Sequence, residues 1–294
     1  MSLEHSAGSL ETTGGDPEVD GLPITVPQRA NASPIRRVGG AVGGPALIVA
    51  GVLIVLHDFA FGGKISSQHV DQLAYQLPLW CFMGRSLSSG HIPAWNPYAL
   101  GGFPSSVDAD SGWMYLPVMA LFTALPCGTA MEWFIVLQPV IGGLGLYWFL
   151  RGEGVSRLAS TFGGLALSLG AAGAMLTIYL PFAALMAWIP VLLGAASRCL
   201  RSATWPRRLV WAALVAVVWG QVAAAFLGSG IVLGTAALVI YGVARTRVEV
   251  REGRLGKQDA AWLWAAIAAD TRRPGAISPS SSRPLSHCTF VSLV

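Results

Sequence analysis

Charged residues are scarce in this chain, and their scarcity excludes most classes of soluble protein. Only 12% of the 294 residues are Asp, Glu, Lys or Arg, which is about half of the share usual in globular domains. Hydrophobic residues make up 53%, and the mean hydropathy is +0.57. The average residue therefore prefers an apolar solvent, and the sequence predicts an integral membrane protein.

Cysteine is also rare, and the four cysteines, at positions 81, 127, 199 and 288, form no CxxC pair. Neither they nor the five scattered histidines have the spacing of metal ligands, so we interpret the cysteines as packing residues and assign no disulfide. The net charge of +4 does not indicate nucleic-acid binding. Its Lys and Arg residues lie in short clusters between apolar runs, as in the cytoplasmic loops of membrane proteins.

The N-terminal segment lacks the apolar core that a signal peptide requires. Residues 1–37 are rich in Gly, Ser, Thr, Pro and acidic residues. Such a composition buries too little apolar surface to fold, so it predicts a disordered cytoplasmic tail.

Long apolar runs follow this tail. A helix needs roughly 20 mostly apolar residues to cross a bilayer. By that measure we predict an all-α helix bundle with spans near 38–56, 130–150, 158–180, 181–197, 209–228 and 229–244, and a partial span at 260–269.

The run 114–126 is ambiguous, because it has only 13 residues and is bracketed by prolines. Its length favours a re-entrant or interfacial segment over a span. Residues 57–129 then form one large extracytoplasmic loop that carries interfacial helices. If this run does span, the tail must lie outside, and the distribution of basic residues barely separates the two models.

Basic residues orient the spans. With the tail inside, 14 Lys and Arg residues lie in the cytoplasm and two, Lys64 and Arg85, lie outside. The Arg36-Arg37 pair beside the first span also favours this orientation. The sequence therefore predicts a multi-pass protein of the cell membrane, with the lipid bilayer as a partner and a cytoplasmic N-terminus.

Two glutamines, Gln138 and Gln221, are strongly polar groups inside predicted spans. Polar groups within a membrane are candidates for function, but an interhelical hydrogen bond explains a single Gln equally well.

The external loop begins with a helical pattern. Apolar residues recur there at steps of three and four, namely Val70, Leu73, Leu77, Trp80, Met83 and Leu87. This spacing predicts a helix that lies along the membrane surface. Asp71 and Tyr75 share its opposite, wetter face at i, i+4, which holds a carboxylate at the boundary between membrane and water.

A polar and proline-rich stretch follows, and its three X-Pro pairs and Gly101-Gly102 turn predict a fixed irregular coil. Trp95 can anchor this coil at the interface or stack on a sugar ring. Asn96 can donate hydrogen bonds to sugar hydroxyls or hold the turn through its own backbone. Asp108 and Asp110 can supply oxygen ligands to a divalent cation, although such acidic pairs also occur in ordinary loops.

Two segments carry a resemblance to a known family. "DQLAYQLPLWCFMGRSLSSGHIPAWNPYALGGFPSSVDADSGWMYLP" and "VLQPVIGGLGLYWFLRGEGVSRLAS" contain, in order, an Asp, a Trp-Asn-Pro block, a later Asp and a Tyr-x-Pro. In this order they resemble the YfhO-type bacterial membrane proteins, over roughly residues 45–245. The resemblance implies a GT-C-like bundle, that is, a polytopic glycosyltransferase that uses a sugar linked to polyprenyl phosphate.

The resemblance also implies roles for individual residues. Asp71 matches the first external acidic position and is the expected general base for the acceptor hydroxyl. Tyr75, Trp95, Asn96, Asp108 and Asp110 are the expected contacts to sugar or acceptor. Apart from the resemblance, Arg85 is one of two external cations, and it either pairs with the carrier phosphate or is simply solvated.

The last apolar run stops after ten residues, and residues 271–294 are rich in Ser, Pro and Arg. From this we expect an aberrant or disordered C-terminus on a truncated chain. One interpretation of such a chain is an inactive remnant of the enzyme. A non-catalytic accessory protein and a transporter-like protein remain the alternative functions.

Overall fold

The computed structural model describes residues 34–62, 71–108, 110–171, 173, 179–202 and 204–253. Every regular element among these residues is helical, which confirms the predicted all-α class. Their one β-type pairing is an isolated bridge between Asn96 and Phe103. Residues 1–33 of the predicted tail, the partial span at 260–269, the residues after it and Lys64 lie outside the described residues. The prediction of a tail up to residue 37 was wrong at its end, because residues 34–37 already belong to the first helix, α1 (Pro34–Val55).

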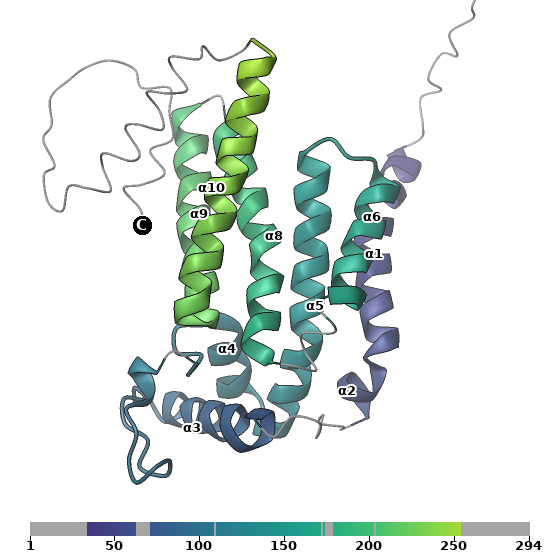
Figure 1. Ribbon diagram of the computed structural model, residues 1–294. Helices are drawn as coiled ribbons and strands as arrows, with labels where there is room; N and C mark the ends of the chain where they lie inside the picture. Colours follow the sequence, from purple (N-terminus) through teal and green to yellow (C-terminus); the bar gives the residue numbers. More distant parts are fainter. Residues whose placement is uncertain are drawn as a thin grey trace, which may run out of the picture.

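Four helices are long and apolar enough to cross a membrane. They are α5 (Cys127–Gly152), α8 (Leu180–Arg201), α9 (Trp205–Ala225) and α10 (Leu227–Arg251). They stand side by side, with α8 packed against α5, α9 and α10 (Figure 1). Helices of this length satisfy their own backbone hydrogen bonds, as a spanning segment must. The prediction of a membrane protein is supported to this extent.

Two further helices pack against α5 on its other side. They are α1 (Pro34–Val55) and α6 (Arg157–Ala166), which continues as the π-helical η3 (Leu167–Ala171). The apolar run 158–180 is therefore not one continuous helix among the described residues. The backbone of Gly170 leaves the helical region (φ −92°, ψ −106°), and α8 begins anew at Leu180.

A close approach of small residues joins α1, α5 and α6. A Cβ atom added at Gly164 would lie 2.7 Å from the carbonyl oxygen of Gly143 and 2.5 Å from Cδ1 of Ile48. Only a residue without a side chain fits at this crossing. Gly143 and Gly164 therefore serve helix packing, as small residues commonly do in membranes.

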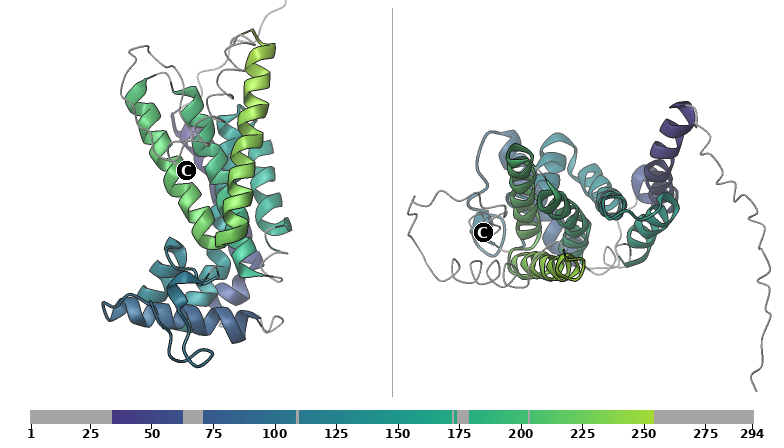
Figure 2. Two further views of the ribbon diagram at one scale, coloured as in Figure 1. Left: turned by 60° about the vertical axis from the view of Figure 1, so that its left-hand side comes forward. Right: turned by 90° about the horizontal axis from the view of Figure 1, so that it is seen from above.

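One end of the bundle carries the long segment between α1 and α5, and we call it the loop end. Its elements are α2 (His57–Phe61), η1 (Gln72–Gln76), α3 (Leu77–Ser88), η2 (Ser105–Val107) and α4 (Leu116–Ala124). Helix α3 lies across the bundle rather than along it (Figures 1 and 2). It buries Trp80 and Met83 of the predicted apolar face and also Leu79, which the predicted spacing did not include.

The ambiguous run 114–126 forms α4, which has nine residues and packs beside α3 at the loop end (Figure 1). It is too short to cross a bilayer. Gly84 of α3 makes this contact possible, because a Cβ there would lie 2.1 Å from the carbonyl oxygen of Phe122.

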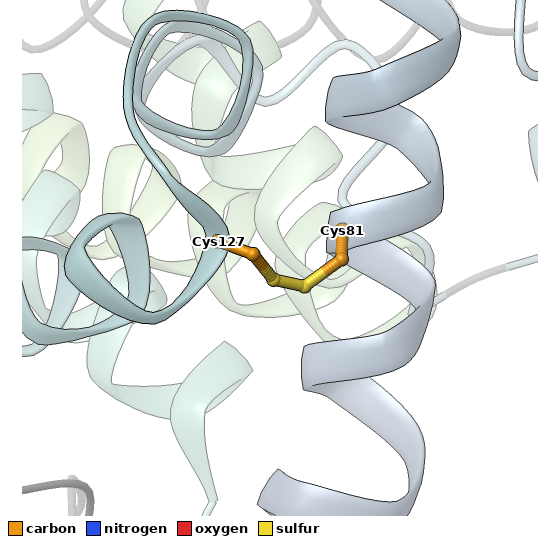
Figure 3. The surroundings of a disulfide bond; sticks show 2 residues. All are labelled: Cys81 and Cys127. Carbon is orange, nitrogen blue, oxygen red and sulfur yellow. A yellow bond between two sulfur atoms is a disulfide. The ribbon is translucent and has the colours of Figure 1, made fainter.

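A disulfide between Cys81 and Cys127 ties α3 to the start of α5 (Figure 3). The two Cα atoms are 5.4 Å apart, within the range of a disulfide. Our interpretation of these two cysteines as simple packing residues was therefore wrong. They lie 46 residues apart in sequence, and only the fold of the loop end brings them together.

The opposite end, where α5, α8 and α10 finish, is the arginine end (Figure 1). Glu153 is the hub of its polar contacts. Its Oε1 accepts hydrogen bonds from the hydroxyls of Ser197 (2.6 Å) and Tyr241 (2.8 Å), and its Oε2 pairs with Arg201 and, at 3.8 Å, with Arg245. Partial burial alone would raise the pKa of Glu153, but these partners together lower it below its ordinary value. The carboxylate joins three helices.

Substitution of Cys81 by Ser should destabilise the loop end. By loop-closure entropy, a crosslink over 46 residues contributes about 4 kcal/mol. Thermal unfolding of the purified protein in detergent measures the loss. Because Cys199 is also disulfide-bonded, reductant acts on the Cys81→Ser, Cys127→Ser double variant as well, and the wild type should lose about 4 kcal/mol more than that variant does. A wild-type protein indifferent to reductant, in both stability and gel mobility, would contradict the bond.

Glu153→Gln should lower stability at neutral pH by about 1.5–3 kcal/mol, the usual value of hydrogen bonds to a charged group. The folded-state pKa of Glu153 is lowered, so its contribution is present above its ordinary pKa of 4.5 and is lost as pH falls through the folded value. Unfolding curves of wild type and variant should therefore converge in acid. Glu249→Gln is the matched control, since it removes only an i, i+4 pair with Arg245, worth less than about 0.5 kcal/mol.

Candidate functional site

Two tyrosine–aspartate pairs lie together at the loop end. The hydroxyl of Tyr75 donates to Oδ2 of Asp108, and the hydroxyl of Tyr179 donates to Oδ2 of Asp110, each at 2.5 Å. The pairs are close enough that Asp110 and Tyr179 both act electrostatically on Tyr75. Asp71 acts in the same way on Tyr179. These five residues, Asp71, Tyr75, Asp108, Asp110 and Tyr179, are the carboxylate site.

A π turn presents Asp71 and Tyr75 to this site. In η1 the N–H of Leu77 bonds to the carbonyl of Gln72, five residues back, rather than four. Pro78 follows directly and has no N–H to offer to the preceding turn. Asp71 stands at the N-cap of η1 and is exposed, whereas Tyr75 is half-buried.

Tyr179 enters the site from the helix bundle. It has an extended backbone (φ −158°, ψ 117°) just before α8. Its ring packs against Phe182 and Phe226, with centroids 5.8 Å away in both cases. Its hydroxyl is left to reach the loop that carries Asp110.

The electrostatics of the site keep both phenols protonated. Burial raises the pKa of Tyr75 and of Tyr179, and the carboxylates that accept their hydrogen bonds raise both further. Burial also raises the pKa of Asp110, as does the charge of Asp108, while the hydrogen bond from Tyr179 lowers it. Both tyrosine hydroxyls therefore donate their hydrogen bonds to Asp108 and Asp110. The carboxylate oxygens that remain can accept hydrogen bonds from a ligand.

Among the described residues, the acidic pair belongs to no larger cluster of metal-ligand side chains. No group of three or more His, Cys, Asp or Glu side chains in that part of the chain could hold a metal ion. Asp108 and Asp110 instead each bind a tyrosine. No step proposed below uses a cation.

The remaining predicted residues lie on the coil and on α3. Asn96 is buried, exchanges backbone hydrogen bonds with Phe103, and accepts the N–H of Tyr98 on its Oδ1 at 3.0 Å. It thus holds the turn, which was one of its two predicted roles. Trp95 is 58% exposed. Arg85 is exposed near the end of α3 and has no ion pair among the described residues.

Two glutamines fix the segment that follows Asp110. The Oε1 of Gln221 accepts the N–H of Leu116, and its Nε2 donates to the carbonyl of Met114. The fully buried hydroxyl of Tyr115 donates to Oε1 of Gln138 and accepts the indole N–H of Trp188, each at 2.8 Å. The sequence left two explanations for these glutamines, a functional role or a structural hydrogen bond. The structure shows hydrogen bonds from both to the segment around Tyr115.

Sequence reasoning found four of the five residues of the carboxylate site and missed Tyr179. Nothing in the pattern around Tyr179 marks it, because it stands at the junction of two apolar runs. Its partner lies 69 residues earlier in the chain. A buried polar group this far from its partner in sequence gives no local signal.

Comparison with known proteins adds no relative. The chain matches no family model, no curated protein and no solved structure.

The Gln221 amide should be necessary for a stable loop end. Gln221→Leu leaves the N–H of Leu116 and the carbonyl of Met114 without this partner, which should cost about 1–3 kcal/mol. Thermal unfolding of the variant measures the loss. Val217→Leu, at an exposed position one turn earlier in α9, is the matched control and should change stability little. Equal stability of the two variants would refute the anchoring role.

Proposed function

We propose that this protein is a GT-C-like membrane glycosyltransferase that moves a sugar from a polyprenyl-phosphate carrier to an extracytoplasmic glycan or cell-wall polymer. The observation that carries the proposal is the carboxylate site, where residues of η1, of the coil after η2 and of the segment before α8 meet. The resemblance of the motifs around Asp71 and Trp95 to the YfhO-type family supplies the type of reaction.

The proposed orientation places the loop end outside the cytoplasm and the arginine end inside. Positively charged residues favour the cytoplasmic ends of spanning helices. The Cys81–Cys127 bond at the loop end fits an oxidising compartment there. Cys199, at the arginine end, is disulfide-bonded as well, so the proposed orientation rests on the basic residues.

The position of α3 suits a lipid-linked donor. A polyprenyl carrier keeps its chain among the lipids and its phosphosugar at the headgroup level. Helix α3 lies across the end of the bundle, where an amphipathic helix follows the membrane surface. An acceptor bound at the carboxylate site would meet the donor at that level.

Asp71 is the proposed general base. The acceptor hydroxyl oxygen attacks the anomeric carbon of the donor sugar, and its proton passes to the Asp71 carboxylate. The bond from the anomeric carbon to the phosphate oxygen breaks, and its electron pair leaves with the carrier phosphate. Asp71 is the exposed carboxylate of the site and stands on a positioned element, so it is accessible to an incoming hydroxyl.

The carrier phosphate requires a cation away from the carboxylates, because like charges repel. Arg85 is exposed on α3, the helix that continues from η1, and is the proposed partner of the phosphate. The exposed ring of Trp95 offers a flat face to the sugar. The turn held by Asn96 keeps that ring in place, since Trp95 packs closely over Gly102.

Asp71→Asn tests the assignment. The purified chain is reconstituted in vesicles with a polyprenyl-phosphate sugar and a glycan acceptor, and transfer is measured at saturating substrate. Loss of the base should lower kcat by roughly 10²–10⁴-fold. Glu132→Gln, which removes a carboxylate in the first turns of α5, is the control and should leave kcat unchanged.

Two outcomes would count against the proposal. Unaltered transfer by the Asp71→Asn variant would refute Asp71 as the base. No transfer by the wild type with any tested carrier-linked sugar would refute the enzymatic function, in favour of a non-catalytic accessory or transporter-like role.

A further inference from the structure

Tyr179 differs from the other residues of the carboxylate site in how it is held. Tyr75 stands on η1, within the loop end itself, whereas Tyr179 belongs to the start of α8. Its hydroxyl bonds to Asp110 across 69 residues of sequence. This contact joins the loop that carries Asp110 to the helix bundle.

An aromatic cluster fixes the ring of Tyr179. Phe182, from the first turn of α8, and Phe226, between α9 and α10, each lie 5.8 Å from it, centroid to centroid. Phe182 and Phe226 also pack edge to face, at 5.2 Å. Since three elements of the bundle meet at this cluster, the phenol hydroxyl has a position set by the bundle and not by the loop.

Asp110 has one oxygen engaged and one not. Its Oδ2 accepts the Tyr179 hydroxyl, while its Oδ1 is buried and has no hydrogen-bond partner among the described residues. A buried carboxylate oxygen is costly unless a donor satisfies it. A hydroxyl of a bound ligand is a donor of the required kind.

We propose that Tyr179 is a positioning residue, which holds the Asp110 carboxylate so that Oδ1 accepts a hydrogen bond from the acceptor glycan. The proposal deepens the glycosyltransferase function proposed above and rests on it for the identity of the ligand. It also defines the ligand class at this point of the site as a hydroxyl-rich acceptor without negative charge, because the tyrosine hydroxyls already donate to Asp108 and Asp110 and carboxylates repel anions.

The groups facing Asp110 predict how its titration responds. They are Tyr179 from just before α8, Asp108 from the same coil and Tyr75 from η1, while Asp71 acts on Tyr179. The Tyr179 hydrogen bond stabilises the ionised form of Asp110 and so lowers its pKa. Removal of that hydroxyl should therefore move the titration of Asp110 to higher pH. Because the proposal requires the ionised Asp110 to accept a hydrogen bond from the acceptor, the acid limb of the pH profile of kcat/KM should also move to higher pH.

Tyr179→Phe tests the inference, because it keeps the ring in the aromatic cluster and removes only the hydroxyl. Infrared spectroscopy of the full chain in lipid follows the carboxylic-acid band of Asp110, which is identified by its loss in Asp110→Asn. We expect the midpoint to rise in Tyr179→Phe. We also expect kcat/KM for the acceptor to fall on the order of 10²-fold, as for a displaced binding group.

Tyr75→Phe is the matched control for the titration. It removes the same kind of hydrogen bond from Asp108 and should leave the Asp110 midpoint nearly in place. An unchanged midpoint in Tyr179→Phe would overturn the inference. A shifted midpoint with unaltered kcat/KM would overturn the positioning role. The infrared titration does not require transfer activity. A wild type without transfer would therefore refute the proposed enzymatic function, while the shift of the Asp110 midpoint would still test the Tyr179–Asp110 hydrogen bond.

Discussion

The loop end depends on a few hydrogen bonds made inside an apolar bundle. Gln221 of α9 binds the backbone on both sides of Tyr115, and the Tyr115 hydroxyl binds Gln138 and Trp188. Met114 has a positive φ of 68°, so this segment cannot satisfy its own backbone as a helix would. Two amides within the bundle therefore make it possible for an irregular segment to enter the bundle at all. Because Asp108 and Asp110 directly precede this segment, the hydrogen bonds that hold it also restrict the positions of these two carboxylates.

Length, apolarity and proline placement were sufficient to predict the helical class and the approximate positions of α5, α8, α9 and α10. These are local properties, since each long helix satisfies its own backbone. The run 158–180 shows the limit of that reasoning. Hydropathy does not register the backbone of Gly170, so a run that appears continuous ends its regular helix there. The Cys81–Cys127 bond could not be predicted, because cysteine spacing does not reveal which parts of a loop fold onto each other.

In the carboxylate site, too, the sequence predicted local features but not the contacts between distant segments. Helical spacing placed Asp71 and Tyr75 on one face, and the coil brought Asp108 and Asp110 into consideration, yet no sequence pattern joined these two sets. The structure joins them through tyrosine hydroxyls. Hydrogen bonds between an apolar-run tyrosine and a distant loop depend on tertiary packing alone. Sequence alone therefore did not reveal that Asp108 and Asp110 each accept a hydrogen bond from a tyrosine.

The π turn at Gln72–Gln76 restricts the changes in length that this segment can accept. Such a turn holds one residue more than an ordinary helical turn, and it lets the first part of the segment face a different direction from α3. Asp71 and Tyr75 can therefore point to the site while Trp80 and Met83 remain in the core. Loss of a single residue here would rotate Asp71 and Tyr75 together away from Asp108, so the length of this turn constrains the site more than the identity of the apolar residues beside it.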